Sequence, residues 1–472
     1  MRPPYRAATV NFFALFSTLL AALLSGGCLS VPRTGPAFSY FRSRQKALPT
    51  IVGDHKPLTS VEVRAVIKGL EQNSSAADNL GHQMALEEAI SGRPFVAGNR
   101  ATLLINRPAA YAAMFKAIQN AKKSINVEIY ILSADRPGHS FADLLMKKAA
   151  EGVHVNLIYD GIGSMCTPPA FFQRLTTAGV KVLPFNPITP LSLLPLPWRW
   201  SPIHRDHSKL VIVDGSIAFT GSANISDVCG EPGGLLSDLL GKKLPWRDTD
   251  VEIEGPVVAQ FQKFFFATWK REKGPPIDEK SYFQPVKPQG NDLVMAVGST
   301  WGKKNRGNYF TYLAAIRSAK HSIDLSCSYF IPDKQIMEAL TAAARRGVDV
   351  KIILPHKSDI KLAQYGGRNY YSRLLKSGVK VYERRDVILH AKTAVIDGVW
   401  STVGSDNMDM WSILRNNELN AVILSRGFAK KMETMFQNDL KNSNEITLQS
   451  WEHRSAVERL IELLTRPLVY WL

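Results

Sequence analysis

The sequence predicts an α/β protein made of two similar lobes, each built on a mixed, mostly parallel sheet. Two observations lead to this fold class: helix-like and strand-like segments alternate along the chain, and the alternation occurs twice with internal similarity. The length of 472 residues is enough for several domains with large cores. A hydrophobic content of 45% and a charged content of 21% exclude a wholly disordered chain.

Three pairs of matching segments carry the internal repeat. In each pair an amphipathic helix is predicted to run into a buried strand, and in two of them a Gly closes the helix before a Val/Ile-rich strand. A stretch with the Pro and Gly of a connector, at 274–292, is predicted to join the two halves. The matched pairs are 117–132 with 315–331, 147–160 with 342–355, and 174–185 with 373–384.

The repeat and its flanks divide the chain into five parts. The tail carries an apolar stripe that ends in Tyr470 and Trp471; we expect it to pack against the protein, with interfacial membrane contact as the alternative. The parts are a signal segment (1–27), a tether with a small helical cap (28–100), a first lobe (101–280), a second lobe (281–452) and an amphipathic tail (453–472).

The chain begins with the parts of an export signal. Arg2 and Arg6 precede an apolar run at 10–24, and small residues come directly before Cys28. This ending resembles a bacterial lipobox, in which the cysteine is lipidated and becomes the first mature residue. We favour a membrane-associated lipoprotein of the cell envelope that faces the periplasm. An uncleaved anchor is the alternative, because about 17 apolar residues can span a bilayer.

The first half contains an insertion. Val182 and His207 lie 25 positions apart, whereas the matching residues of the second half lie nine apart, so 16 residues are extra (25 − 9). The insertion falls within 184–203 and is rich in Pro, Leu and Trp. It is interpreted either as a loop packed on the protein surface or as a loop that dips into a membrane, where Trp198 and Trp200 would suit the interface.

The charge balance favours an anionic partner. Lys and Arg total 58 and Asp and Glu total 41, which gives a net charge of +17. Such a balance suits nucleic acid, an anionic membrane surface or a phosphorylated substrate. Four cysteines without a CxxC pair argue against a disulfide scaffold and against a zinc site of that kind.

The strongest signal is a motif present once in each half. HSKLVIVD at 207–214 and HAKTAVID at 390–397 both read H-x-K-x4-D, and G-S-x-N begins seven positions after each Asp. Two copies at matching spacing are far more specific than one. The candidate residues are His207, Lys209, Asp214, Ser222 and Asn224 in the first copy and His390, Lys392, Asp397, Ser405 and Asn407 in the second.

These residue types suit phosphoryl chemistry. Residues i and i+2 of a strand share a face, so the His and Lys of each copy are predicted to point into one site. Lys can stabilise phosphate oxygens, and the Ser and Asn side chains can donate hydrogen bonds to them. Imidazole can attack phosphorus and can hold or release a proton. Because lysines already balance the phosphate charge, we expect neither a metal nor any other cofactor.

The acidic candidates form two groups. Asp214 and Asp397 each end a strand before a Gly, so a turn role is at least as plausible for them as a catalytic one. Asp248 and Glu418 correspond to each other when the two halves are aligned on the apolar strands that follow them. We expect these two carboxylates to bond Nδ1 of the imidazoles and to fix their tautomers.

The duplicated H-x-K-x4-D with G-S-x-N resembles the phospholipase D superfamily, over roughly residues 100 to 450. Three segments are similar to the bacterial cardiolipin synthase branch: residues 101–118, IHRDHSKLVIVDG and WRDTDVEIEGPV. The resemblance implies two α/β lobes with one active site at their interface and a covalent phosphohistidine formed without metal. The tract 228–245 has no counterpart in the family pattern.

The resemblance also implies a reaction and roles for the residues. One phosphatidylglycerol would give its phosphatidyl group to the enzyme and release glycerol, and a second would accept the group to form cardiolipin. His207 is assigned as the nucleophile and His390 as the acid, although the repeat allows exchanged roles. Lys209, Lys392, Asn224 and Asn407 would hold the phosphate. The partners are then phospholipids and a membrane surface, with no nucleic acid.

Three other functions are compatible with parts of the sequence. A hydrolytic phospholipase D would use the same covalent step with water as the acceptor. An exported nuclease of the same superfamily suits the net charge of +17, but the size, the apolar insertion and the export signal argue against it. A non-enzymatic lipid-binding lipoprotein would be expected to have lost a motif His or Lys, and both copies are intact.

Overall fold

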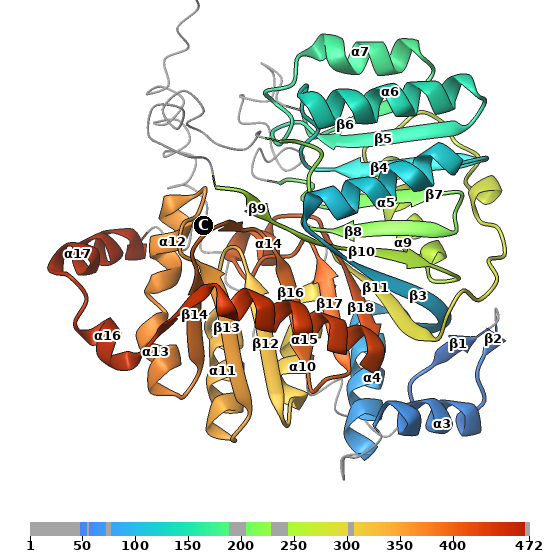
Figure 1. Cartoon of the computed structure of the whole chain (residues 1–472). Helices are drawn as coiled ribbons and strands as arrows, with labels where there is room; N and C mark the ends of the chain where they lie inside the picture. Colours follow the sequence, from blue (N-terminus) through green and yellow to red (C-terminus); the bar gives the residue numbers. More distant parts are fainter. Residues whose placement is uncertain are drawn as a thin grey trace, which may run out of the picture.

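The computed structural model describes residues 48–53, 56–71, 77–187, 204–227, 244–300 and 306–467. The predictions for Cys28, for the apolar run at 10–24 and for most of the insertion (188–203) and of the tract (228–243) fall outside the described residues. Within them, two α/β lobes lie side by side and confirm the predicted fold class (Figure 1).

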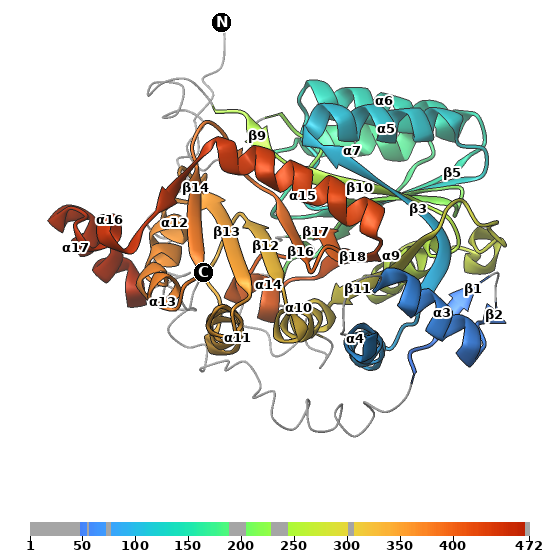
Figure 2. The ribbon, with the colours of Figure 1, turned by 60° about the horizontal axis from the view of Figure 1, so that its bottom comes forward.

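The first lobe is a sheet covered on both faces. Helices α5, α6 and α7 lie together on one face (Figure 2), and α9 covers the other. Side chains of β7 alternate between the two cores, because successive residues of a strand point to opposite faces. Its strands run in the order β6-β5-β4-β7-β8-β10-β3. Their bounds are β3 Phe95–Ile105, β4 Ser124–Ile129, β5 His154–Asp160, β6 Lys181–Phe185, β7 Lys209–Val213, β8 Ile217–Gly221 and β10 Thr249–Glu254; the helices are α5 Asn106–Asn120, α6 Arg136–Ala150, α7 Pro169–Thr177 and α9 Val258–Arg271.

The second lobe repeats this arrangement. The order β14-β13-β12-β16-β17-β18-β11 matches the first lobe strand for strand, and β19 (Ser443–Ile446) is added beside β14. Helices α10 and α11 lie on one face and α15 on the other. The bounds are β11 Asp292–Ser299, β12 Ser322–Cys327, β13 Asp349–Pro355, β14 Lys380–Arg384, β16 Lys392–Ile396, β17 Trp400–Gly404 and β18 Glu418–Leu424; the helices are α10 Gly307–Ser318, α11 Lys334–Arg345, α12 Lys361–Arg368, α13 Tyr371–Lys376, α14 Met410–Leu414 and α15 Arg426–Lys441.

The predicted helix-to-strand junctions are present in both lobes. Gly152, Gly179, Gly347 and Gly378 each end a helix with φ between 86° and 92°, a conformation that favours glycine. One detail of the fold prediction is wrong. The parallel pairs are β4–β5–β6 and β12–β13–β14, while the strands on the other side of each sheet pair antiparallel, so antiparallel pairs are in the majority. Parallel pairs are joined by helical crossovers, which the sequence pattern indicated. The β7–β8 and β16–β17 hairpins reverse the chain direction and therefore add antiparallel pairs.

The two lobes form one continuous structure. Strand β3 pairs antiparallel with β11, which joins both sheets, and it runs across the predicted domain limit at 100–101. A core between the lobes combines α9 residues such as Phe261 with α15 residues such as Met432. The connector at 272–291 contains one short 3-10 helix, η2 (Glu279–Tyr282). At the centre, β9 (Trp246–Arg247) of the first lobe pairs with β15 (Ile388–Leu389) of the second.

The flanking segments pack on the second lobe. Near the N-terminus are β1 (Ile51–Gly53), β2 (Lys56–Pro57), α3 (Ser60–Leu70) and α4 (Ala77–Ser91), and their buried Ile67 and Met84 share a core with Leu313 of α10. At the other end, α16 (Leu448–Glu452) and α17 (Ala456–Thr465) lie beside α13 and α12 (Figure 1). Across the described ranges, none of the helices combines the length and apolar character needed to cross a bilayer.

Candidate active site

The two motif copies meet at the boundary between the lobes. His207 lies two residues before the start of β7, and His390 lies two residues before the start of β16. Both imidazoles and both motif lysines are buried. Burial, followed by the charges of both lysines, lowers the pKa of His207 and of His390. The structure brings the two His–Lys pairs together at this boundary, because each imidazole is bonded to a carboxylate of the opposite lobe.

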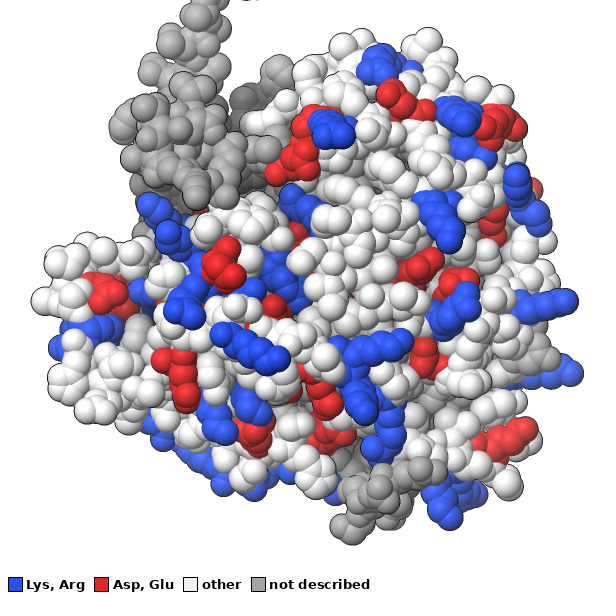
Figure 3. Space-filling view, viewed as in Figure 1, with Lys and Arg blue, Asp and Glu red and all other residues white. Residues whose placement is uncertain are grey.

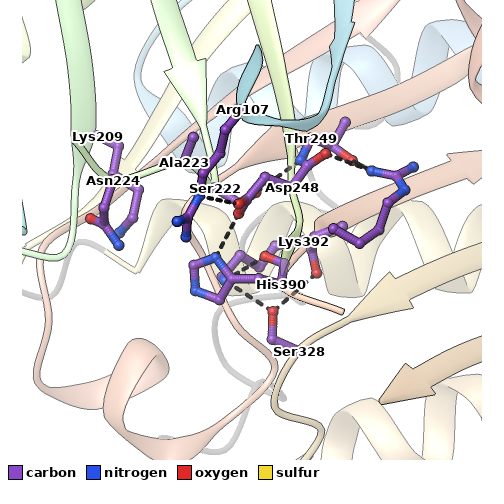
Figure 4. Close-up of polar contacts among 12 residues, drawn as sticks. Arg107, Lys209, Ser222, Ala223, Asn224, Asp248, Thr249, Ser328, His390 and Lys392 are labelled. Carbon is purple, nitrogen blue, oxygen red and sulfur yellow. Dashed lines mark hydrogen bonds and ion pairs between the residues drawn. The ribbon is translucent and has the colours of Figure 1, made fainter. Parts of the chain in front are cut away.

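Each imidazole is held by a carboxylate from the other lobe. His207 Nδ1 lies 3.0 Å from both carboxylate oxygens of Glu418. His390 Nδ1 lies 2.8 Å from Asp248 Oδ1, a contact that Figure 4 shows. Sequence alignment of the halves identified both carboxylates but gave no indication that they would cross between the lobes.

Backbone pairing between the lobes sets this exchange. The His207 N–H donates to the carbonyl of Asn417, the residue before Glu418, at 3.0 Å. The His390 N–H donates to the carbonyl of Arg247, the residue before Asp248, also at 3.0 Å. A main-chain hydrogen bond thus fixes each histidine beside the carboxylate of the opposite lobe. The two halves of the site are related by a pseudo-twofold axis.

Neighbouring hydroxyls orient the carboxylates. Ser405 Oγ donates to Glu418 at 2.6 Å, and Ser222 Oγ donates to Asp248 at 2.8 Å. This corrects the expectation that the two serines bind phosphate, because a hydroxyl has one proton and here it is directed to a carboxylate. Glu418 also accepts from Ser412 Oγ at 2.7 Å.

Burial favours the neutral form of both imidazoles. Burial raises the pKa of Asp248, but the hydrogen bond and charge of His390 and the charge of Arg107 outweigh burial and lower it. Burial also acts on Glu418, where His207 and Lys209 prevail and lower the pKa. Burial lowers the pKa of His207 to about 4 and that of His390 to about 3.

The carboxylates also decide which ring nitrogen carries the proton. An ionised carboxylate only accepts hydrogen bonds, so each neutral ring carries its proton on Nδ1 and leaves the Nε2 lone pair available for reaction.

The motif lysines are anchored and easily deprotonated. Lys209 Nζ donates to the carbonyl of His207 at 2.8 Å, and Lys392 Nζ donates to the carbonyl of His390 at 2.7 Å and to Ser328 Oγ at 3.0 Å. Burial, followed by the charge of Lys392, lowers the pKa of Lys209 to about 7, and burial lowers that of Lys392 to about 8. An anion placed between them would restore their charge.

The motif asparagines are buried in the same region. Asn224 accepts a hydrogen bond from the Ile131 N–H through Oδ1 at 3.2 Å, so its amide N–H groups stay available to an acceptor. Its counterpart Asn407 is buried as well.

Asp214 and Asp397 lie outside the site. Asp214 follows β7 at the end opposite Lys209 and accepts the backbone N–H groups of residues 122–124 at 2.7–3.2 Å. Asp397 accepts those of residues 320–322 at 2.8–3.0 Å. Both have positive φ, 50° and 52°, which aspartate tolerates at a turn. Their inclusion in the catalytic set is corrected, because strand length separates them from their motif His.

Asp214→Ala is expected to lower stability without lowering the turnover of the folded protein. It removes a carboxylate that accepts three backbone N–H groups, and hydrogen bonds to a charged acceptor contribute about 1.5–3 kcal/mol. We expect the free energy of unfolding in urea to fall by about 2 kcal/mol. Asp214→Asn is the control, since it keeps an acceptor and the turn conformation. A normal unfolding midpoint with lost turnover would contradict this assignment.

Several residues of the site carry no distinguishing sequence signal. Arg107, in the first turn of α5, pairs with Asp248 Oδ2 at 2.8 Å. Tyr130 packs edge-on against His207 and Trp246 against His390. A comparison of the repeats could have found one pair: Tyr130 and Ser328 lie six positions after Ser124 and Ser322 respectively. Arg107 lies far from both motifs in the chain and is found only in the folded protein.

Among the residues that the structure describes, no cluster of three or more His, Cys, Asp or Glu side chains has the arrangement of a metal site.

Comparison with known proteins places the chain. Residues 114–228 and 312–440, one segment in each lobe, match the family "Cardiolipin synthase, PLD-like domain". A cardiolipin synthase of Alkalihalophilus pseudofirmus is 32% identical over 397 residues, which cover 82% of this chain and 76% of that protein. Cardiolipin synthase 1 of Bacillus anthracis is 32% identical over 398 residues, covering 82% and 75%. The crystal structure of phosphatidylserine synthase from Haemophilus influenzae has a TM-score of 0.57 at 13% identity over 82% of this chain and 99% of that chain, which shows a shared fold.

A duplicated α/β fold in which each lobe contributes one buried His–Lys pair to a shared interface site defines an enzyme of the phospholipase D type. With its matched segments and its relatives, the chain belongs to the family of cardiolipin synthases with phospholipase D-like domains.

Proposed function

We propose that this chain transfers a phosphatidyl group between phospholipids, converting two phosphatidylglycerol molecules into cardiolipin and glycerol through a phosphohistidine. The observation that carries the proposal is the reciprocal arrangement of the two imidazoles, each bonded at Nδ1 to a carboxylate of the opposite lobe. Both rings thereby keep Nε2 for reaction, as a displacement with a nucleophile and an acid requires. The family membership supports the lipid substrates.

In the first step His207 acts as the nucleophile. Its Nε2 lone pair attacks the phosphorus of the donor, an N–P bond forms, and the bond from phosphorus to the glycerol oxygen breaks. His390 enters this step as the imidazolium, with its Nδ1 proton bonded to Asp248, and gives its Nε2 proton to that oxygen, so glycerol leaves as a neutral alcohol and the His390 ring becomes neutral. Glu418 stabilises the positive charge that develops on the His207 ring.

The second step reverses the first with a new alcohol. The hydroxyl of a second phosphatidylglycerol loses its proton to His390 and attacks phosphorus. The N–P bond breaks, and its electron pair returns to His207. Lys209, Lys392 and the amides of Asn224 and Asn407 hold the phosphate oxygens in both steps.

The proposed function is tested by product analysis. Purified protein is incubated with phosphatidylglycerol vesicles labelled in the headgroup and in the acyl chains, with and without EDTA. We expect one cardiolipin for each glycerol released and no effect of EDTA, because lysines supply the charge balance. Phosphatidic acid as the sole product would assign a hydrolytic phospholipase D instead. Strong inhibition by EDTA would contradict metal-free chemistry, and cleavage of DNA would contradict the absence of a nucleic-acid substrate.

The lysines are expected to give the reaction an alkaline limit. Lys209 and Lys392 have pKa values of about 7 and about 8, so each loses its charge as the pH rises through that range. An uncharged lysine binds phosphate less well, while bound phosphate restores the charge. We therefore expect kcat/KM to fall at alkaline pH mainly because KM rises. Steady-state rates at several pH values measure this, and Lys209→Arg, which keeps its charge, should flatten the limit. A KM that is constant with pH would contradict the role.

We further propose that Cys28 is lipidated and tethers the protein to the periplasmic side of a membrane. The motivation is the apolar run followed by small residues and cysteine in the sequence. In cells fed labelled fatty acid, the wild-type chain should incorporate label, and Cys28→Ala should run as the unprocessed precursor without label. Cys166→Ala is the matched control. Unchanged mobility and labelling in the Cys28 variant would favour an uncleaved anchor.

A further inference from the structure

Helix α17 (Ala456–Thr465) has its apolar side toward solvent. Leu460, Leu463 and Leu464 are 55%, 61% and 64% exposed, and Val457 is 66% exposed. The buried residues of the same helix include Glu462. A surface helix ordinarily places its apolar stripe on the core and its charges in water, so α17 is inverted. Figure 3 shows mostly uncharged atoms at the left edge of the molecule, where Figure 1 draws α16 and α17.

Polar contacts on the inner side fix this orientation. Arg454 pairs with the buried Glu462 at 2.8 Å, and Arg368 of α12 lies 3.6 Å from Glu458. Ser455 and Glu458 form a capping box that fixes the start of the helix. Because the charged side of α17 is bonded to the protein, rotation of the apolar side toward the protein would break these pairs.

The surroundings of the apolar side have the composition of an interfacial helix. Arg459 and Arg466 are seven positions apart and both exposed, so they lie along one flank, where long basic side chains can reach anionic headgroups. The Arg459 guanidinium also donates to the carbonyl of Glu452. The sequence continues after α17 into an apolar stretch at 468–472 that contains Tyr470 and Trp471, residue types enriched at membrane interfaces. A basic flank beside exposed leucines is complementary to an anionic lipid surface.

The helix is also connected to the active site. It packs on α12, and the loop before α12 carries Asp359, which accepts a hydrogen bond from the Tyr329 hydroxyl at 2.7 Å. Tyr329 directly follows Ser328, whose Oγ bonds Lys392. Helix α17 therefore packs on α12, in the segment that follows the carboxyl end of β13. Lys392 begins β16 beside the carboxyl end of β12, so both lie at the same end of the strands.

We propose that α17 is a membrane-contact helix, with Val457, Leu460, Leu463 and Leu464 inserted among the headgroups of an anionic bilayer. This contact would place the sheet edge that carries Lys392 against the surface that supplies phospholipid substrates. The inference rests on the proposed function for the identity of those substrates. Lipid contact itself can be measured without turnover.

The first test measures the position of α17 directly in the full chain. Cys28, Cys166 and Cys229 are changed to Ser, and a fluorophore is attached at Leu463→Cys; the buried Cys327 is kept. With phosphatidylglycerol vesicles that contain nitroxide-labelled lipids, we expect quenching at position 463. A label at Glu338→Cys, exposed on α11, should not be quenched.

Two outcomes of this test would overturn the proposal. One is a label at 463 that is not quenched while the protein sediments with the vesicles. The other is shielding of the label that needs only high protein concentration and no lipid, which would assign the apolar side to a second copy of the chain.

The second test measures the consequence for turnover. The triple change Leu460→Ser, Leu463→Ser and Leu464→Ser is expected to lower activity on phosphatidylglycerol vesicles about tenfold and to leave activity on dispersed short-chain phosphatidylglycerol unchanged. Val61→Ser, at an apolar position on α3 that is more exposed than any of the three leucines, is the control. Unchanged activity on vesicles would overturn the proposal. Absence of cardiolipin with the wild-type chain would instead reject the proposed function, and the quenching result would still stand.

Discussion

His207→Ala and His390→Ala are each expected to reduce transfer by about four orders of magnitude or more. Each ring is needed in a different half of the same displacement, and neither can replace the other because each Nδ1 is bonded to its own carboxylate. The measurement is initial cardiolipin formation from phosphatidylglycerol vesicles, with thermal unfolding as the check on folding. Substantial activity in either variant would contradict the scheme with two histidines.

A donor with an activated leaving group separates the two roles. Phosphatidyl-p-nitrophenol releases its alcohol without a proton, so the acid is dispensable in the first step. His390→Ala should then give a burst of p-nitrophenol equal to the enzyme concentration and accumulate an acid-labile phosphoryl-enzyme. His207→Ala should give neither. A burst in His207→Ala instead would exchange the two assignments while leaving the covalent mechanism in place.

The second large effect concerns the carboxylates that cross between the lobes. Glu418→Gln and Asp248→Asn keep the shape of each side chain but offer an amide to Nδ1, and the ring can then carry its proton on the wrong nitrogen. A comparable change in a Ser-His-Asp triad lowers kcat by about 10⁴-fold. We expect losses of about 10²- to 10⁴-fold in kcat here, with smaller changes in KM.

Because each carboxylate bonds the histidine of the opposite lobe, the activated donor should restore the first step in only one of the two carboxylate variants. Asp248 holds His390, the acid, so the burst of p-nitrophenol should be retained in Asp248→Asn. Glu418 holds His207, the nucleophile, so the burst should be lost in Glu418→Gln. Pairing within each lobe would give the opposite result.

Glu383→Gln is the matched control for the carboxylate variants. This buried glutamate bonds His356 Nδ1 at 2.9 Å and Arg368 at 3.0 Å but lies outside the site. Its loss should affect stability and leave kcat unchanged. A loss of kcat comparable to that of Glu418→Gln would show that the effect comes from removing any buried carboxylate, not from the tautomer of the catalytic ring.

Local patterns allowed much of the fold to be predicted. Helix ends with glycine in a positive-φ conformation and buried Val/Ile strands are properties of short segments, so the matched pairs at 147–160 and 342–355 were found as helix–strand units. The proportion of parallel pairs was predicted wrongly, because the partner of a strand depends on hairpins and on β3 and not on the composition of the strand.

The internal repeat allowed the residues of the site to be predicted, but not the contacts between them. Comparison of the halves identified the His–Lys pairs and singled out Asp248 and Glu418 as corresponding carboxylates. It also grouped Asp214 and Ser222 with the site, since a motif preserves every residue of a recurring unit, whether it serves the turn, the carboxylate or the substrate. The hydrogen-bond partners in the folded protein distinguish these roles: Asp214 bonds the backbone of a turn, and Ser222 bonds the carboxylate of Asp248.

The sequence by itself determined the two α/β units, the chemistry of the imidazoles and lysines, and the amphipathic character of the tail, because each depends on residues close together in the chain. Tertiary structure decided which carboxylate serves which histidine and which side of α17 is exposed. The bonds that settle these points join residues 211 and 142 positions apart at the histidines and 90 positions apart between Arg368 and Glu458 (458 − 368), and no pattern within a segment encodes such partners. They follow from the energy of packing two lobes and a tail against each other, which exists only in the folded chain.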